Sequence, residues 1–128
     1  MIEVACAIIK RDDTILITRR SAAMPHPGLW EFPGGKLMPG ETPEQCITRE
    51  IQEELNVAVR AIRLLTSQVH SYPGRSIRLI PLVCEIVSGE IELQQHSESA
   101  WIRRDELDRY DLLEADIKVI DAWTDADW

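Results

Sequence analysis

Apolar and polar residues alternate along the first third of the chain in the way that predicts β-strands. Residues 3–10 are rich in Val, Ala and Ile and predict a buried strand. Residues 14–19 alternate between two faces, with Ile15 and Ile17 on one and Leu16 and Thr18 on the other. We expect the two segments to form a hairpin. A Pro- and Gly-rich loop at 21–28, a short strand at 29–32 and a Gly-Gly turn at 34–35 follow.

The pattern changes to a helical period after residue 42. Ile47, Ile51 and Leu55 fall on one arc of a helix with about 3.6 residues per turn. Thr42 begins the sequence Thr-Pro-Glu-Gln, which predicts an N-cap, a proline in the first turn and a capping box. Asn56 predicts a left-handed C-cap. We therefore expect a well-delimited helix between these two caps.

The second half again predicts mainly strands and ends in a helix. We predict a helical turn at 104–109, capped by Asp105. We predict a final helix at 113–123, with an apolar stripe of Ile117, Ile120 and Trp123. Strands before and after the central helix favour an α+β fold, a single domain over residues 1–128 with a mixed sheet between helices. Extended segments are expected at 57–66, 67–72, 77–87, 91–93 and 99–103, with turns at 73–74 and 88–89.

Composition and charge narrow the classes of partner. The 128 residues carry a formal net charge of −8, which argues against a nucleic-acid polymer. No apolar run approaches the ~20 residues of a membrane span, and the N-terminus lacks the basic region of a signal peptide. Cys6, Cys46 and Cys84 form no CxxC pair and predict buried, reduced thiols. A cytoplasmic location is therefore expected.

The central helix also carries a cluster of like charges. Glu50, Glu53 and Glu54 share the flank beside the apolar arc, where carboxylates repel one another. A cation lying on the cluster would remove this repulsion. Oxygen ligands alone suit a hard divalent ion, so the cluster predicts a site for Mg²⁺ or Mn²⁺.

The stretch from 34 to 57, GGKLMPGETPEQCITREIQEELNV, resembles the Nudix hydrolase signature GX5EX7REUXEEXGU, where U is a bulky aliphatic residue. The one departure is Asn56, which replaces a glycine. Because Asn also adopts a positive φ, we expect the helix end and the activity to survive. The sequences at 18–20 and 30–36 are similar to the MutT-like branch. The matching positions are Gly35, Glu41, Arg49, Glu50, Ile51, Glu53, Glu54 and Val57.

The resemblance implies the Nudix fold, an α/β/α sandwich, and Mg²⁺-dependent hydrolysis of a nucleoside triphosphate to monophosphate and pyrophosphate. It implies metal binding by Glu50, Glu53, Glu54 and the carbonyl of Gly34. Such ions polarise a phosphoryl group and activate a water molecule for attack, here at the β-phosphorus. Glu50 or Glu53 is the expected general base, and the sequence does not choose between them. Arg49 is expected to orient the glutamates, because a guanidinium can hold two carboxylates.

Residues around the signature receive further expected roles. Glu41 is interpreted as a structural partner of the helix. Arg20 and Lys36 match family positions that contact phosphates, with a solvated surface charge as the alternative for each. Some relatives add a glutamate six residues before a tryptophan, and here that position is Gln95, a poor metal ligand and no base. His96 and Glu98 are nearby replacements, although a solvated loop is the preferred interpretation of both.

The resemblance to the MutT-like branch also implies that the base is recognised at the start of the final helix, by Asp116, with Tyr72 and Arg75 as further candidates. An ionised aspartate only accepts hydrogen bonds, so Asp116 fits the amino group of cytosine and the N1–H and N2 donors of guanine equally well. The alternative is that it merely flanks the helix. The first hypothesis is nucleotide-pool sanitisation of the 8-oxo-dGTP type, and the alternative is CTP, dCTP or 5-methyl-dCTP pyrophosphohydrolysis. A non-catalytic nucleotide-binding module is a remote alternative, because its glutamate set would normally be broken. The partner is then a small nucleotide, and the chain a monomer or dimer.

Overall fold

One mixed sheet of eight strands forms the centre of the computed structural model, which describes residues 1–127. Trp128, the last residue of the predicted domain, lies outside the described residues. The helical segments are α1 (Pro43–Leu55), η1 (Arg104–Arg109), α2 (Glu114–Asp121) and η2 (Asp125–Asp127). The strands are β1 (Ile2–Arg11), β2 (Thr14–Arg19), β3 (Trp30–Glu31), β4 (Gly34–Lys36), β5 (Ala58–Leu64), β6 (Gln68–Tyr72), β7 (Arg75–Ser88) and β8 (Glu98–Arg103).

Strand β1 is the centre of the sheet. It pairs with β7 in parallel along almost its whole length, from the Ile2–Ile77 pair to the Ile9–Cys84 pair. It also pairs antiparallel with β2 and β4, so it joins both halves of the sheet. The order of hydrogen-bonded strands is β3-β2-β1-β7-β5. In addition, β4 pairs with β1, β6 with β7, and β8 with β2.

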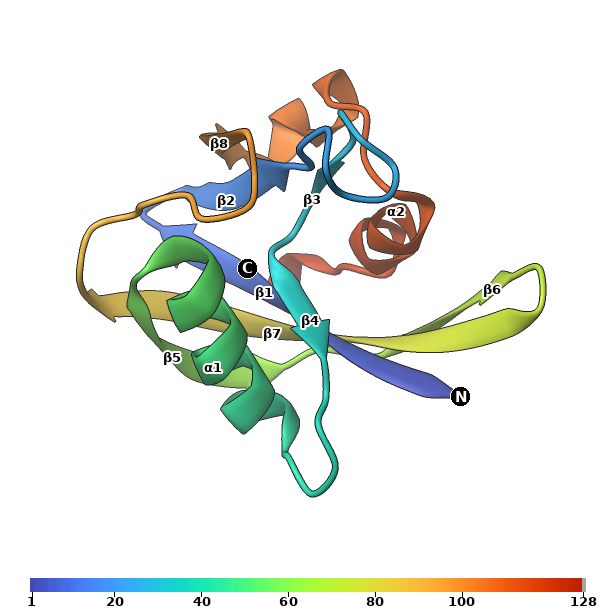
Figure 1. Ribbon diagram of the computed structural model, residues 1–128. Helices are drawn as coiled ribbons and strands as arrows, with labels where there is room; N and C mark the ends of the chain where they lie inside the picture. Colours follow the sequence, from blue (N-terminus) through green and yellow to red (C-terminus); the bar gives the residue numbers. More distant parts are fainter. Residues whose placement is uncertain (128) are drawn as a thin grey trace.

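The two α-helices cover opposite faces of this sheet (Figure 1). Ala5, Ala7 and Ile9 of β1 pack in one apolar cluster with the buried side chains of α1. Cys6 and Ile8, which point the other way, pack in a second cluster with α2. The predicted sandwich of a mixed sheet between helices is therefore confirmed. No helix in the described part of the chain is long and apolar enough to cross a membrane.

Helix α1 has the predicted caps. The Thr42 hydroxyl accepts from the Gln45 amide at 3.1 Å, and the Gln45 side chain accepts from the Thr42 amide at 3.0 Å. At the other end, Asn56 has φ 58° and ψ 33°, and its amide donates to the Gln52 carbonyl. Ile47 and Ile51 are fully buried, each side chain adding roughly 1.5–3 kcal/mol of hydrophobic stabilisation.

Two predicted elements, the turn at 34–35 and the strand at 91–93, are wrong. Gly34–Lys36 is not a turn but strand β4, which pairs with β1 so closely that a Cβ on Gly34 would lie 2.0 Å from the Ala5 carbonyl oxygen. Only glycine allows this approach. Residues 91–93 are not a strand. Their backbone instead packs at the end of α1, where the Glu92 amide donates to the Leu55 carbonyl at 2.9 Å.

The predictions for the last two helical segments are partly wrong. Asp105 does not cap η1: the Glu106 side chain accepts from the Arg103 amide at 3.0 Å, whereas Asp105 contacts the Arg103 side chain. Helix α2 is shorter than predicted, and its apolar stripe is different. Ile117 is 41% exposed, and the buried positions in α2 are Ala115, Asp116 and Val119. A buried aspartate in this row directs attention to the space beside the helix.

Candidate functional site

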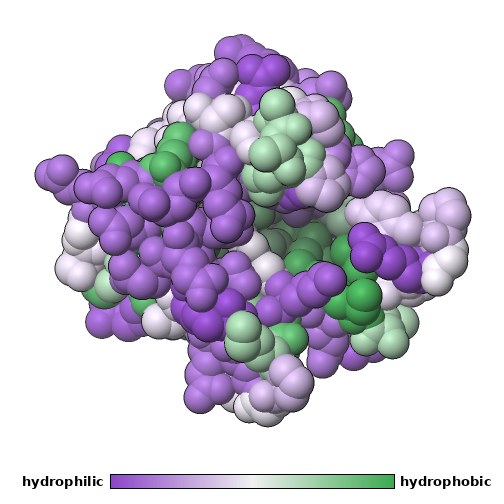
Figure 2. Space-filling model, viewed as in Figure 1, coloured by the Kyte–Doolittle hydropathy of each residue, from purple (hydrophilic) through white to green (hydrophobic). Residues whose placement is uncertain are grey.

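A cleft of about 310 Å³ lies between β4 and α2. Figure 2 shows it as a hollow with an apolar floor, bordered by both hydrophilic and apolar side chains. The signature contributes Gly34, Gly35, Lys36 and Glu54, and the opposite end contributes Tyr72, Arg75, Leu113 and Asp116. Arg20, Glu31 and the loop residues Met24, Pro25 and His26 also line it.

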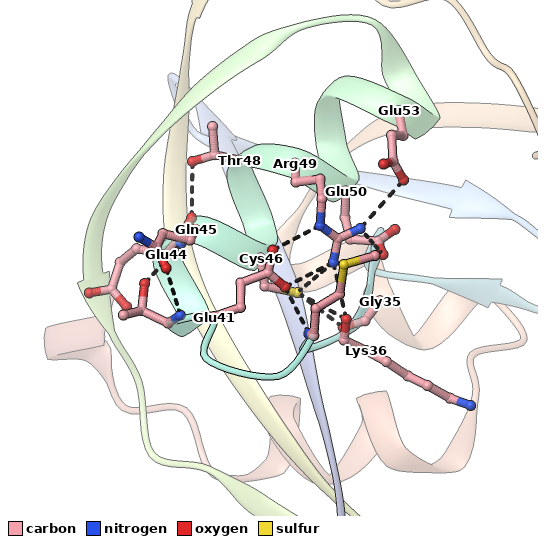
Figure 3. Close-up of polar contacts among 12 residues, drawn as sticks. Gly35, Lys36, Glu41, Glu44, Gln45, Cys46, Thr48, Arg49, Glu50 and Glu53 are labelled. Atoms are coloured by element: carbon pink, nitrogen blue, oxygen red, sulfur yellow. Dashed lines mark hydrogen bonds and ion pairs between the residues drawn. The ribbon is translucent and has the colours of Figure 1, made fainter.

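Arg49 holds the carboxylates of the signature in place (Figure 3). Its Nε and Nη2 donate to the two oxygens of Glu41 at 2.8 and 2.9 Å, and its Nη1 donates to Glu50 at 2.9 Å. The contact with Glu53 is longer, at 3.5 Å. The hydrogen bonds from Arg49, followed by one from the Met38 backbone, lower the pKa of Glu41 to about 2. The contacts are those expected of an orienting arginine and of a structural partner at Glu41.

Glu50 lies behind the cleft wall, against Gly35. A Cβ built on Gly35 would stand 2.3 Å from the Glu50 carboxyl carbon, so a side chain at this position would displace the carboxylate. Cys46, one turn earlier on α1 and fully buried, has its Sγ within hydrogen-bond distance of the carbonyls of Gly35 and Lys36. The glycine therefore allows the carboxylate of Glu50 to approach the backbone of β4.

Glu54 is the signature carboxylate that faces the cleft, and it is buried. It is 6% exposed, and its Oε2 has no hydrogen-bond partner among the described residues. Burial, followed by the nearby charges of Glu50 and Glu31, raises the pKa of Glu54 to about 8, although a hydrogen bond with the Gly34 backbone opposes the shift. An isolated carboxylate in such a place costs free energy unless a cation accompanies it.

The structure brings only part of the predicted metal set together. Gly34 and Glu54 line the cleft, whereas Glu53 does not; its side chain is 57% exposed and turned toward Arg49 (Figure 3). In the described part of the chain, no three His, Cys, Asp or Glu side chains are gathered closely enough to hold an ion. The unpartnered Glu54 oxygen and the oxygen-only donors beside it nevertheless fit a hard divalent cation.

Asp116 lies at the other end of the cleft and is 4% exposed. Burial, followed by the charge of Glu31, raises the pKa of Asp116 well above its usual range. A hydrogen bond with the Phe32 backbone and the charge of Arg20 lower the pKa but do not offset this rise. These surroundings favour the protonated carboxyl. An ionised Asp116 only accepts hydrogen bonds, whereas its protonated form would also donate one.

The two predicted phosphate contacts differ in their surroundings. Lys36 is exposed at the rim of the cleft. Arg20 is not a solvated surface charge, because its side chain is 15% exposed and its Nη1 donates to Glu31 at 2.8 Å. Both remain candidates for contacting a phosphate.

The loop before β8 gives a clear correction. Gln95 is exposed, and Glu98 is an exposed partner of Arg19 at 3.0 Å. His96, however, is buried and bonded to Glu31, so its interpretation as part of a solvated loop is wrong. Glu31 was assigned no role from the sequence. The available signal was a lone acidic residue between Trp30 and Phe32, in a strand whose other side chains pack in the core.

Comparison with known proteins matches residues 1–123 to the NUDIX domain. The chain is 36% identical over 123 residues to a CTP pyrophosphohydrolase of Escherichia coli strain K12, covering 96% of this chain and 91% of the relative. It is 34% identical over 102 residues to an 8-oxo-dGTP diphosphatase of the same strain, covering 79% of each. Among solved structures, that of the E. coli ORF135 protein superposes with a TM-score of 0.82 at 35% identity, covering 95% of this chain and 87% of the other.

Proposed function

The chain belongs to the Nudix family, and on that premise we propose that it hydrolyses a nucleoside triphosphate to the monophosphate and pyrophosphate. One observation carries the proposal: the cleft has a buried carboxylate with an unpartnered oxygen, Glu54, at one end and a second buried carboxyl, Asp116, at the other. Such a cleft suits a ligand with a metal-bound, anionic end and a hydrogen-bonding end. A nucleotide has both.

Enzymes of this family generally need a divalent metal ion, and we propose Mg²⁺, with Mn²⁺ as an alternative. Glu50, Glu53, Glu54 and the Gly34 carbonyl are the proposed ligands. When bound, such an ion polarises a phosphoryl group and offsets the charge of the phosphates. Glu53 contacts Arg49 at 3.5 Å and does not line the cleft, so its participation requires its side chain to move toward the cleft.

The remaining roles belong to the chain itself. Lys36 and Arg20 bind phosphate oxygens at the rim, and Arg49 holds Glu41 and Glu50 so that the helix carboxylates keep their places. Glu50 or Glu53 takes a proton from the water that attacks the β-phosphorus. Their exposures differ, at 17% and 57% of the side chain, and both stay candidates for the general base.

Base recognition is proposed for Asp116, Tyr72 and Arg75. Tyr72 stands at the edge of the cleft with the Arg75 guanidinium 5.4 Å from its ring centroid, an arrangement that can flank a planar base. An 8-oxo-dGTP type substrate is the first to test. A cytidine nucleotide is the second, and it is favoured by the CTP pyrophosphohydrolase relative, which matches 96% of the chain.

The test is a panel of triphosphates, namely 8-oxo-dGTP, dGTP, CTP, dCTP, 5-methyl-dCTP and ATP, incubated with Mg²⁺. Pyrophosphate and phosphate are measured separately. Release of pyrophosphate that stops on chelation supports metal-dependent cleavage between the α- and β-phosphates, and ¹⁸O from labelled water found in the pyrophosphate, not in the monophosphate, supports attack at the β-phosphorus. Release of phosphate alone would contradict the assigned bond, and no turnover of any member would refute the triphosphatase proposal.

We also propose that residues 1–128 form one domain that works as a monomer or dimer in the cytoplasm. All three cysteines are buried and unpaired, as expected of a reducing compartment. Sedimentation at several concentrations tests the oligomeric state.

A further inference from the structure

A buried histidine contacts the wall of the cleft, although it has no role in the reaction proposed above. The side chain of His96 is 0% exposed, and its Nε2 lies 2.8 Å from Oε2 of Glu31. The neutral ring must carry its hydrogen on Nε2, because a carboxylate oxygen only accepts. The other ring nitrogen is buried and has no hydrogen-bond partner in the described part of the chain. Among the described residues, Glu31 is therefore the one hydrogen-bond partner of the His96 ring.

The second oxygen of Glu31 extends this contact along the wall of the cleft. It accepts from Nη1 of Arg20 at 2.8 Å, and Nε of Arg20 donates to the carbonyl of Pro25. Pro25 belongs to the loop between β2 and β3, which lines the cleft together with Arg20 and Glu31. A series of three contacts thus runs from the loop before β8, the orange segment in Figure 1, to the loop between β2 and β3.

Both oxygens of Glu31 are occupied, so its carboxylate has a fixed orientation. Arg20 is in turn held by two of its nitrogens, while its Nη2 makes no hydrogen bond to the described residues. That nitrogen remains for a ligand in the cleft. An arginine held in this way loses less side-chain entropy on binding than a mobile one.

We propose that His96 is a positioning residue for nucleotide binding. It fixes Glu31, and Glu31 fixes Arg20 and the loop at Pro25, so that the wall of the cleft is formed before the nucleotide arrives. His96 itself touches neither the nucleotide nor the reacting atoms. The inference rests on the proposed function, because the ligand that the wall receives is the proposed triphosphate.

The first test separates binding from chemistry. In H96A, the KM for the best triphosphate rises about tenfold while kcat stays within about threefold of wild type. In H96Q, the amide nitrogen can still donate to Glu31, and KM returns to within about threefold of wild type. E98Q changes a neighbouring exposed residue of the same segment and leaves both constants unaltered. If H96A does not fold, H96M fills the same volume without a donor and replaces it.

A double-mutant cycle tests the route through Glu31. If His96 acts through this carboxylate, H96A adds no further increase in KM in an E31A background. A full additional increase would overturn the proposal, as would an H96A enzyme with unchanged KM or an H96Q enzyme as impaired as H96A.

A structural readout keeps the inference distinct from the activity. In proton–nitrogen NMR spectra, the Arg20 Nε–H of the wild type is slow to exchange because it donates to Pro25, and H96A makes this exchange faster while H96Q does not. If the wild type hydrolysed no triphosphate, the proposed function would fail and this NMR result alone would decide the positioning role. An unchanged Arg20 signal in H96A would overturn it.

Discussion

Replacing Glu54 with glutamine should make the metal-free protein less sensitive to rising pH. Burial, foremost, raises the pKa of Glu54 from 4.5 to about 8. Because the folded state binds the proton more tightly than the unfolded state, the associated stability is present below the unfolded pKa and is lost as pH rises through the folded one. One pKa unit corresponds to ~1.4 kcal/mol, so raising the pH from about 5 to 8 removes roughly 3 kcal/mol of unfolding free energy through this group.

Urea unfolding in the presence of a chelator, at several pH values between about 5 and 8, measures the effect. E54Q does not titrate in this range, so its stability advantage over wild type should widen by roughly 3 kcal/mol toward the alkaline end. Asp116 also has a raised pKa, but it is present in both proteins and cancels in the difference. E53Q is the matched control, because that side chain is 57% exposed. Its difference from wild type should change far less with pH, because Glu53 contributes less to the raised pKa of Glu54 than burial does.

Parallel pH curves for wild type and E54Q would refute the reasoning that burial controls this carboxyl. A second arm tests the cation. At the alkaline end, added Mg²⁺ should restore the stability of the wild type, since a ligand that binds only the folded state stabilises it, and should have little effect on E54Q. Equal stabilisation of both proteins by Mg²⁺ would remove Glu54 from the metal site.

Three further substitutions test separate parts of the site. G35A places a Cβ 2.3 Å from the Glu50 carboxyl carbon, so kcat/KM should fall at least about tenfold with little change in melting temperature, and full activity would exclude Glu50 from the chemistry. N56A puts alanine at φ 58° and should cost about 1 kcal/mol in urea unfolding, whereas N56G should match or exceed wild type, and equal midpoints for both would contradict the cap. D116N should change the ratio of kcat/KM for 8-oxo-dGTP and CTP by more than about tenfold, and an unchanged ratio would exclude Asp116 from base recognition.

The sequence predicted α1 well because the signals for this helix are local. Thr42 and Gln45 are three residues apart, and Asn56 tolerates the left-handed conformation through its own side chain. Every partner needed to define the helix ends lies within one turn of them. The alternation of residues 14–19 is likewise a property of consecutive residues, and the structure places Ile15 and Ile17 in one apolar cluster and Leu16 in the other.

Features that depend on distant residues were missed. β4 exists because Gly34 pairs with Cys6, and two glycines in sequence look like a turn until that neighbour is known. Helical periodicity placed Glu54 on the same flank as Glu53, but in the structure Glu54 is 6% exposed in the cleft whereas the side chain of Glu53 is 57% exposed. His96 was taken for a solvated residue because nothing near it in the sequence indicates its contact with Glu31.

The two faces of β1 have a consequence for how this scaffold can change over evolutionary time. Ala5, Ala7 and Ile9 support the helix that carries the signature, while Cys6 and Ile8 belong to the cluster beneath α2 and Asp116. Mutations on one face need not disturb the packing of the other, because side chains on opposite faces of a sheet do not touch. On the proposed role of Asp116 in base recognition, substitutions on the α2 face can change the preferred base without altering the packing beneath the signature helix. On the proposed roles, the reaction and the preferred base can evolve separately, because the residues that support them pack on opposite faces of β1.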